Sequence, residues 1–211
     1  MQELEKIIGY RFRNKKYLEE ALTHPSYSPD SSYERLEFLG DLILDTVVGI
    51  YLYKKYKDKN EEFLTNLKSS YVNNNYLKKI CDEIQIMKFA RHKNCNIKRT
   101  DRFLEALIGA LYLDGGWIAV KKFIKNFILN RELEPLKDYK NLLLNYARKT
   151  KQVSPEYKII SEKGFPHKKE FVVKVKIKGI RKIGKGKGES IKEAELLAAK
   201  ELYEKLMNLK K

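Results

Sequence analysis

The sequence predicts two domains of different fold class: an all-α domain over residues 1–136 and a small α+β domain of order α-β-β-β-α over residues 137–211. Apolar residues recur every three or four positions in the first range, as on helices, and they alternate in parts of the second, as on strands. The net charge changes at the same place, from +4 in the first range to +12 in the second. Because a chain of 211 residues can form one or two cores, two domains are reasonable.

The helical period of the first domain falls into five stretches. They are residues 4–22, the acidic stretch that begins at residue 34, and residues 63–84, 103–113 and 120–129. Pro135 interrupts this periodicity because proline cannot continue a helix, so the domain boundary is expected close to it.

The second domain begins with a helix predicted from Tyr139 to Thr150. Strands are predicted at residues 155–161 and 171–178, the second with alternate residues Phe171, Val173, Val175 and Ile177 on one face. A third strand is expected at residues 180–183, breaking into the run GKGKGES, and a last helix from about Ser190 to Met207.

Composition narrows the classes of function. With 43% hydrophobic and 34% charged residues the chain is of the globular type, and its charge of +16 indicates a polyanionic partner, with a membrane surface or simple solubility as alternatives. The apolar run from Leu42 to Tyr53 is too short to span a bilayer, and the N-terminus does not resemble a signal peptide. A cytoplasmic protein without a membrane partner is expected.

The two cysteines carry no structural signal. Cys81 and Cys95 do not have the spacing of a disulfide framework or a zinc site.

Four carboxylates form a stripe on the predicted helix that begins at residue 34. At roughly 100° per residue, Glu34, Glu37, Asp41 and Asp45 fall within an arc of about 80°. The rest of this helix is apolar and should be buried, and carboxylates near a core repel one another unless a cation holds them. These carboxylates therefore predict a divalent metal site. The alternative is that the stripe is only the solvent-exposed face of an amphipathic helix.

A second acidic pair favours the metal site over that alternative. Asp101 and Glu105 lie four residues apart in another apolar helical segment, so two adjacent helices would form one carboxylate cluster. The basic composition of the chain also makes a stripe of carboxylates without lysines unusual.

Four blocks in a fixed order resemble the ribonuclease III family of double-strand-specific RNA endonucleases. The most specific block is ERLEFLGD at residues 34–41; the others are ALTHPSY at 21–27, FLTNLKSSYVNNNYLKKI at 63–80 and EALIGALYLDGG at 105–116. The resemblance implies a metal-dependent endoribonuclease that cleaves double-stranded RNA and leaves 5′-phosphates and short 3′ overhangs. It also implies a role in RNA processing, including the processing of ribosomal RNA. Carboxylate-held Mg²⁺, or Mn²⁺ in its place, suits this chemistry because it activates water and relieves charge on the leaving oxygen.

The resemblance assigns roles to particular residues. Glu37, Asp41 and Glu105 match the metal ligands of the family, and Glu34 and Glu61 match acidic positions at the edges of its catalytic valley. Phe38 matches an apolar knob that enters the partner subunit, which implies a homodimer with one site for each strand of the RNA.

One position departs from the family pattern, which has Asp three residues before the Glu of the second motif. Arg102 occupies that position, and Asp101 lies one residue farther away. We predict that Asp101 takes the place of the missing Asp as a catalytic metal ligand and that Arg102 points away, toward solvent or RNA phosphate. Either a single-turn π-bulge or a helix start at residues 100–102, for which Thr100 is a plausible N-cap, would turn Asp101 toward the other carboxylates. Two alternatives remain: Asp101 only complements the helix dipole, or the chain is a catalytically inactive RNA-binding protein on the same scaffold, for example ribosome-associated.

The second domain resembles the double-stranded RNA-binding domain, which reads A-form shape across two minor grooves. The resemblance is carried by GFPH at residues 164–167 and by GKGKGESIKEAELLAAK at residues 184–200. The side chains it implies for RNA contact are Asn145, His167, Lys185, Lys187 and Lys192. The GKGKG run lacks the Lys-Ser/Thr ending of a nucleotide-binding loop, so no nucleotide cofactor is expected.

Overall fold

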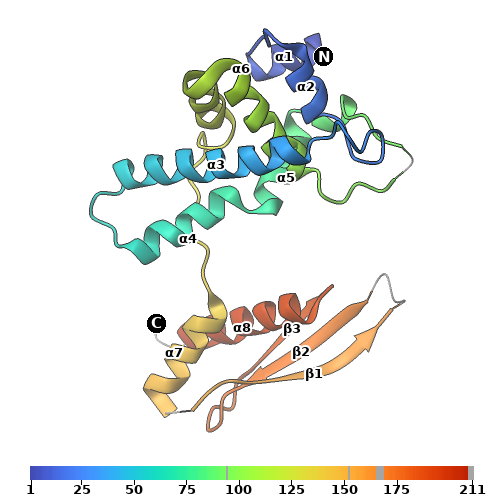
Figure 1. Cartoon of the computed structure of the whole chain (residues 1–211). Helices are drawn as coiled ribbons and strands as arrows, with labels where there is room; N and C mark the ends of the chain where they lie inside the picture. Colours follow the sequence, from blue (N-terminus) through green and yellow to red (C-terminus); the bar gives the residue numbers. More distant parts are fainter. Residues whose placement is uncertain (94, 152, 165–168, 209–211) are drawn as a thin grey trace. The chain divides into compact units, whose positions relative to one another are not determined.

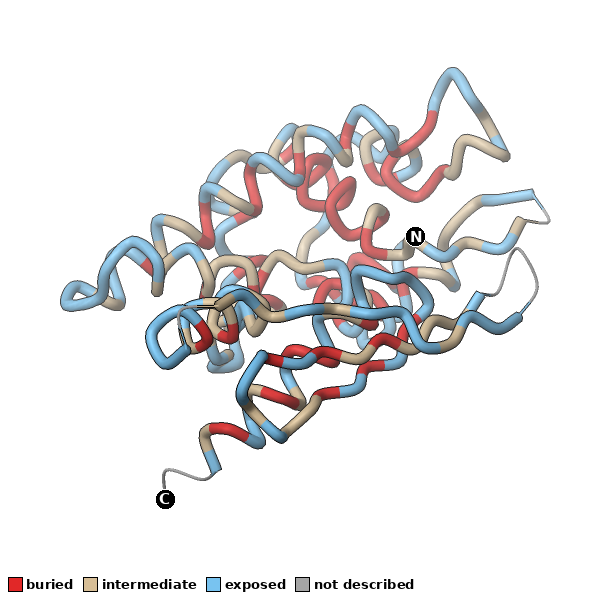
Figure 2. The backbone as a smooth tube through the Cα atoms, turned by 90° about the horizontal axis from the view of Figure 1, so that it is seen from below, coloured by how far each residue is buried: buried red, intermediate tan, exposed pale blue. Residues whose placement is uncertain are grey.

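The structure is a computed structural model that describes residues 1–93, 95–151, 153–164 and 169–208. The chain divides into two units, Met1–Leu136 and Lys137–Lys211 (Figure 1). Each unit has its own apolar core, and the buried positions are marked along the backbone in Figure 2.

The described part of the first unit is helical. Its elements are α1 (Gln2–Ile8), α2 (Lys15–Ala21), α3 (Glu34–Lys55), α4 (Glu61–Val72), α5 (Asn74–Glu83), the 3₁₀ turn η1 (Ile86–Lys88) and α6 (Asp101–Phe127). Two of the predicted stretches are each divided into two helices. Gly9 ends α1 with a left-handed φ of 67°, and Asn73 separates α4 from α5 because its side chain accepts the backbone N–H of Tyr76 at 2.9 Å.

Helix α6 is longer than predicted and lies in the core of the first unit. It joins the two stretches predicted at residues 103–113 and 120–129 across a kink at Gly116, where φ is 65° and ψ is −163°. By length and composition α6 could span a membrane, but 61% of its most apolar window is buried inside the unit. Its apolar composition is therefore accounted for by packing, chiefly against α3.

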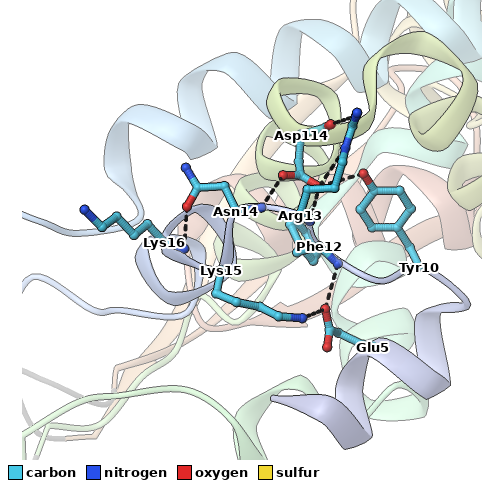
Figure 3. A network of polar contacts seen from close by, with 8 residues as sticks. All are labelled: Glu5, Tyr10, Phe12, Arg13, Asn14, Lys15, Lys16 and Asp114. Atoms are coloured by element: carbon cyan, nitrogen blue, oxygen red, sulfur yellow. Dashed lines mark hydrogen bonds and ion pairs between the residues drawn. The ribbon is translucent and has the colours of Figure 1, made fainter.

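Asp114 of α6 ties the N-terminal segment to the core (Figure 3). Its carboxylate accepts the backbone N–H groups of Arg13 and Asn14 at 2.9 and 2.8 Å and the hydroxyl of Tyr10 at 2.7 Å. Burial alone would raise the pKa of Asp114, but these hydrogen bonds and the charge of Arg13 outweigh it and leave the pKa below its usual value. The connection between α1 and α2 is thus held by Asp114, and Glu5 of α1 also holds it by accepting the backbone N–H of Phe12 at 2.7 Å.

We expect Asp114→Ala to lower the free energy of unfolding by about 2–4 kcal/mol, because two backbone N–H groups lose their acceptor. Since the folded pKa of Asp114 is lowered, its contribution is present above the usual value of 3.8 and is lost as the pH falls through the folded pKa. Urea unfolding at pH 7 and near pH 3 measures both effects. The matched control, Asp30→Ala at an exposed loop position, should change stability by less than about 0.5 kcal/mol. Equal losses in the two variants would contradict the assignment.

The second unit has the predicted order α-β-β-β-α. Its elements are α7 (Tyr139–Lys151), β1 (Glu156–Lys163), β2 (Glu170–Lys176), β3 (Ile183–Gly188) and α8 (Ile191–Met207). The antiparallel sheet has the order β1-β2-β3, and both helices cover the same face of it (Figure 1). The core residues include Leu143 of α7, Val173 and Val175 of β2, and Ala198 and Leu202 of α8.

The third strand is displaced from the predicted one. The prediction placed it at residues 180–183 and treated GKGKG as a break, whereas β3 covers Ile183–Gly188 and includes that run. The glycines are required by the close approach of α8: a Cβ on Gly184 or Gly186 would lie 2.1 Å from a carbonyl oxygen of α8. Glycine, which usually weakens a strand, is here what allows the helix to pack on the sheet.

Candidate functional site

The predicted metal ligands come from two helices whose backbones touch. A Cβ on Gly40 of α3 would lie 1.7 Å from the carbonyl oxygen of Glu105 on α6. A Cβ on Gly109 of α6 would lie 2.3 Å from the carbonyl oxygen of Leu36 on α3. Two glycines therefore allow α3 and α6 to pack in direct backbone contact, and this contact brings the two acidic segments together.

Two of the four predicted ligands are engaged by arginines. Arg99 binds the fully buried Asp101 through both carboxylate oxygens, with Nε at 3.1 and 2.8 Å and a terminal nitrogen at 2.7 Å. Nε of Arg102 lies 3.3 Å from a carboxylate oxygen of Glu37. The prediction that Arg102 points away from the site is therefore wrong.

The start of α6 explains this arrangement. The helix begins at Asp101, as the capping prediction required, but Thr100 has helical dihedral angles and makes no side-chain cap. Thr100 therefore occupies the predicted N-cap position but does not stabilise the helix end through its side chain. Because residue 101 is in the first turn, Asp101 faces Arg99 of the preceding segment. Arg102, the next residue, extends toward Glu37 on α3 at the place where α3 and α6 cross in contact through Gly40 and Gly109, called the crossing below.

The remaining two ligands, Asp41 and Glu105, form no ion pair among the described residues. Glu105 is 6% exposed, and its pKa is raised to about 7 by burial and then by the charges of Asp41, Asp101 and Glu37, with Arg99 opposing. The pKa of Asp41 is also raised, by partial desolvation and by Asp45. These shifts identify a local excess of negative charge at the contact between the helices.

The flanking acidic residues have hydrogen-bond or ion-pair partners of their own. Glu34 is exposed and accepts a hydrogen bond from Ser32 at 3.3 Å. Asp45 forms an ion pair with Lys68 of α4 at 2.6 Å. Glu61 is in the first turn of α4, next to the C-terminal end of α3 (Figure 1).

Carboxylate oxygens are the donors that Mg²⁺ and Mn²⁺ prefer. The buried Glu105 forms no ion pair in the part of the chain that the structure describes, and Arg99 offsets its charge only in part, so the donor chemistry fits such an ion. No group of three His, Cys, Asp or Glu side chains among the described residues is arranged to hold a metal. This is compatible with Mg²⁺, which is usually bound by one or two carboxylates while water and substrate phosphate complete its coordination.

Phe38 projects from α3 beside the acidic crossing and is 70% exposed. An adjacent hollow of about 730 Å³ is lined in part by Phe38 and by Tyr17, Leu39 and Leu113. An exposed aromatic side chain and a partly apolar hollow therefore lie next to each other on this face.

The predicted RNA-contact residues of the second unit lie on different elements. Asn145 is exposed on α7, and Lys192 is exposed in the first turn of α8, whose N-terminus is capped by Ser190. Lys185 and Lys187 are on β3, where they alternate with the buried glycines and so face away from α8. Lys187 also pairs with Glu170 at 2.8 Å. His167 lies outside the described residues.

Fold and site together define a class of two-domain proteins, whose parts are as follows in this chain. A helical domain with carboxylates at a helix crossing is joined to a strongly basic α-β-β-β-α domain of the type that binds double-stranded RNA.

Comparison with known proteins identifies the family. Residues 14–132 match the ribonuclease-III-like family, and residues 139–206 match the double-stranded RNA binding motif. The chain is 39% identical to Ribonuclease 3 of Aquifex aeolicus over 98% of this chain and 97% of that protein. It is 39% identical to Ribonuclease 3 of Campylobacter fetus over 94% of this chain and 95% of that protein. The chain therefore belongs to the ribonuclease III family.

Solved structures agree with this assignment. The nuclease domain of ribonuclease III from Campylobacter jejuni is 33% identical, with a TM-score of 0.59, over 61% of this chain and 96% of that domain. A second structure of the same domain, at 2.2 Å resolution, gives a TM-score of 0.59 at 31% identity.

The sequence analysis missed Arg99, which pairs with Asp101, and it wrongly directed Arg102 away from Glu37. Arg99 and Arg102 flank Asp101 in the string RTDR, and this alternation of charge was the signal available in the sequence. Gly40 and Gly109 were not singled out either. Their signal is a glycine inside an otherwise apolar helix, which usually marks close backbone contact.

Proposed function

We propose that the chain is a metal-dependent endoribonuclease that cleaves double-stranded RNA. The observation that carries this proposal is the pair Asp41 and Glu105, which contribute two carboxylates, unpaired among the described residues, at the contact of α3 and α6. Membership in the ribonuclease III family and the match to the double-stranded RNA binding motif support the choice of reaction and substrate.

The reaction assigned to this site is hydrolysis of a phosphodiester to a 5′-phosphate product. Mg²⁺ or Mn²⁺ bound by Asp41 and Glu105 would supply an activated water and relieve the charge on the phosphate. The two carboxylates would hold the ion, and the close backbone contact at Gly40 keeps the helices that carry them adjacent. The positive field of the second unit attracts the RNA, whose phosphates carry most of the binding free energy.

The direct test is incubation of the purified protein with long duplex RNA, with Mg²⁺ and with a chelator. Cleavage to short duplexes that depends on Mg²⁺ supports the proposal, with single-stranded RNA of the same sequence as the control substrate. Binding of duplex RNA without cleavage in Mg²⁺ or Mn²⁺ would instead assign the chain to non-cleaving RNA-binding proteins.

The proposal includes a homodimer, with Phe38 of each copy inserted into the hollow of the other. In the C. jejuni domain the region involved in dimer formation has been described as structurally flexible, which supports a dimer in this family. Reciprocal insertion gives a two-fold interface and places two sites on one duplex.

We expect Phe38→Ala to weaken dimerisation by at least about 30-fold, because truncation of a buried aromatic anchor costs at least about 2 kcal/mol. Sedimentation equilibrium over nanomolar to micromolar concentrations measures the change. Ile160→Ala, which removes an exposed apolar side chain from β1, is the matched control and should leave association unchanged. A wild-type monomer at micromolar concentration would refute the dimer.

Deletion of residues 137–211 should weaken duplex binding much more than it affects folding of the helical unit, which has its own core. The deleted residues carry +12 of the net charge, so the slope of log K against log salt should become clearly shallower, by about 0.9 for each RNA phosphate that the shortened protein no longer neutralises. Filter binding between 50 and 300 mM salt, with circular dichroism as the folding control, measures both. An unchanged affinity and slope would contradict the role of the second unit.

A further inference from the structure

Arg102 contacts the predicted ligand set from the position where the family pattern has a carboxylate. Its Nε is buried and has no hydrogen bond among the described residues, although it lies 3.3 Å from Glu37. The side chain as a whole is 37% exposed, so parts of the guanidinium group or its stem other than Nε are accessible to solvent. The hydrogen-bonding capacity of this guanidinium is therefore only partly used.

The charges at the crossing do not balance. Glu37, Asp41, Asp101 and Glu105 face two guanidinium groups, those of Arg99 and Arg102. Arg99 is held by Asp101 through both carboxylate oxygens, and Arg102 is held by Glu37. Within the described ranges, Asp41 and Glu105 are left without an ion pair, and one divalent cation would neutralise their two negative charges.

We infer that Asp41 and Glu105 hold a single divalent ion, and that Arg102 binds a non-bridging oxygen of the scissile phosphate in the role that a second ion would otherwise have. This inference deepens the proposed cleavage of RNA and rests on it. A site with two metal ions stabilises the attacking and leaving oxygens with two centres of positive charge. A guanidinium can supply one of those centres because its planar array of N–H donors matches phosphate oxygens.

Glu37 prepares Arg102 for this contact. The ion pair holds the guanidinium at the crossing before RNA arrives, so little side-chain entropy is lost when the phosphate binds. The ion pair also withdraws Glu37 from the metal ligands. Glu37 is thus assigned as a positioning residue, and Arg102 as the residue that contacts substrate.

The test that does not depend on cleavage is the number of ions bound. Isothermal titration of the full-length protein with MnCl₂, without RNA, should give one Mn²⁺ per chain for the wild type and also for Arg102→Ala. Arg102→Asp places a second carboxylate beside Glu37 and should raise the number to two. Two ions per chain in the wild type, or one in Arg102→Asp, would overturn the inference.

The second measurement is the rate at saturating Mn²⁺. Arg102→Ala should lower kcat by about 10²- to 10³-fold, the usual loss for one electrostatic contact to the transition state. Arg102→Lys, which keeps the charge without the planar donors, should recover part of that loss. Duplex affinity and the thermal unfolding midpoint should stay close to those of the wild type in both variants. Cleavage by Arg102→Ala at the wild-type rate would exclude the phosphate contact while leaving the proposed function intact.

A wild-type protein that does not cleave would refute the proposed function and, with it, the substrate contact of Arg102. The ion count would then still decide whether Asp41 and Glu105 form a single-ion site. The two failures are therefore distinguishable.

Discussion

Glu105→Gln is expected to lower the rate of Mg²⁺-dependent cleavage of duplex RNA by at least about 10³-fold, equivalent to roughly 4 kcal/mol of transition-state stabilisation. The amide has nearly the same shape as the carboxylate but carries no charge to hold the ion. Because Glu105 belongs to the helical unit, the affinity for duplex RNA, which is assigned mainly to the second unit, should stay within about twofold. Single-turnover cleavage and filter binding on the same preparation measure the two quantities.

The matched control for this prediction is Asp45→Asn. Asp45 lies one turn beyond Asp41 on the same acidic stripe, but it pairs with Lys68 of α4 at 2.6 Å. Its substitution should change the cleavage rate by less than about tenfold and should cost at most about 1 kcal/mol of stability. If Glu105→Gln cleaved at the wild-type rate, or if both variants lost activity equally, the assignment of the ion to the helix contact would be wrong.

Gly40→Ala is expected to have the second large effect, on both stability and cleavage. Its new methyl group would lie 1.7 Å from the carbonyl oxygen of Glu105. The two helices must therefore move apart to remove this clash. Overpacking of this kind commonly costs about 1–3 kcal/mol, and here the obstacle is backbone, which cannot rotate away. Because the displacement also separates Asp41 from Glu105, cleavage should fall by about 10²-fold even in the molecules that remain folded.

Gly49→Ala is the matched control on the same helix, because a Cβ at Gly49 meets nothing within 4 Å. This substitution should be neutral or should stabilise α3 by about 0.5–1 kcal/mol, as expected for a helix interior. Chemical denaturation of both variants gives the comparison. A Gly40→Ala protein as stable and as active as Gly49→Ala would show that close contact between α3 and α6 is not needed.

Local sequence features determined most of the secondary structure. The period of three to four predicted the helices of the first unit, and alternation from Phe171 to Ile177 predicted β2. The third strand was misplaced because Ile180–Ile183 has higher intrinsic strand propensity than a glycine-rich run. What stabilises β3 is the helix packed on Gly184, Gly186 and Gly188, and this contact between distant segments has no local signal.

In the site, too, some features follow from local sequence and others only from contacts between distant segments. The sequence by itself determined which helix faces carry Glu37, Asp41 and Glu105, because the helical repeat of 3.6 residues fixes which side chains share a face. Only the tertiary structure decided which of these carboxylates are neutralised. Where α6 begins and how closely it packs on α3 place Arg102 on Glu37 and Arg99 on Asp101, and leave Asp41 and Glu105 without an ion pair among the described residues. Electrostatic pairing depends on distances of a few ångströms between separate helices, and such distances are set by packing rather than by spacing along the chain.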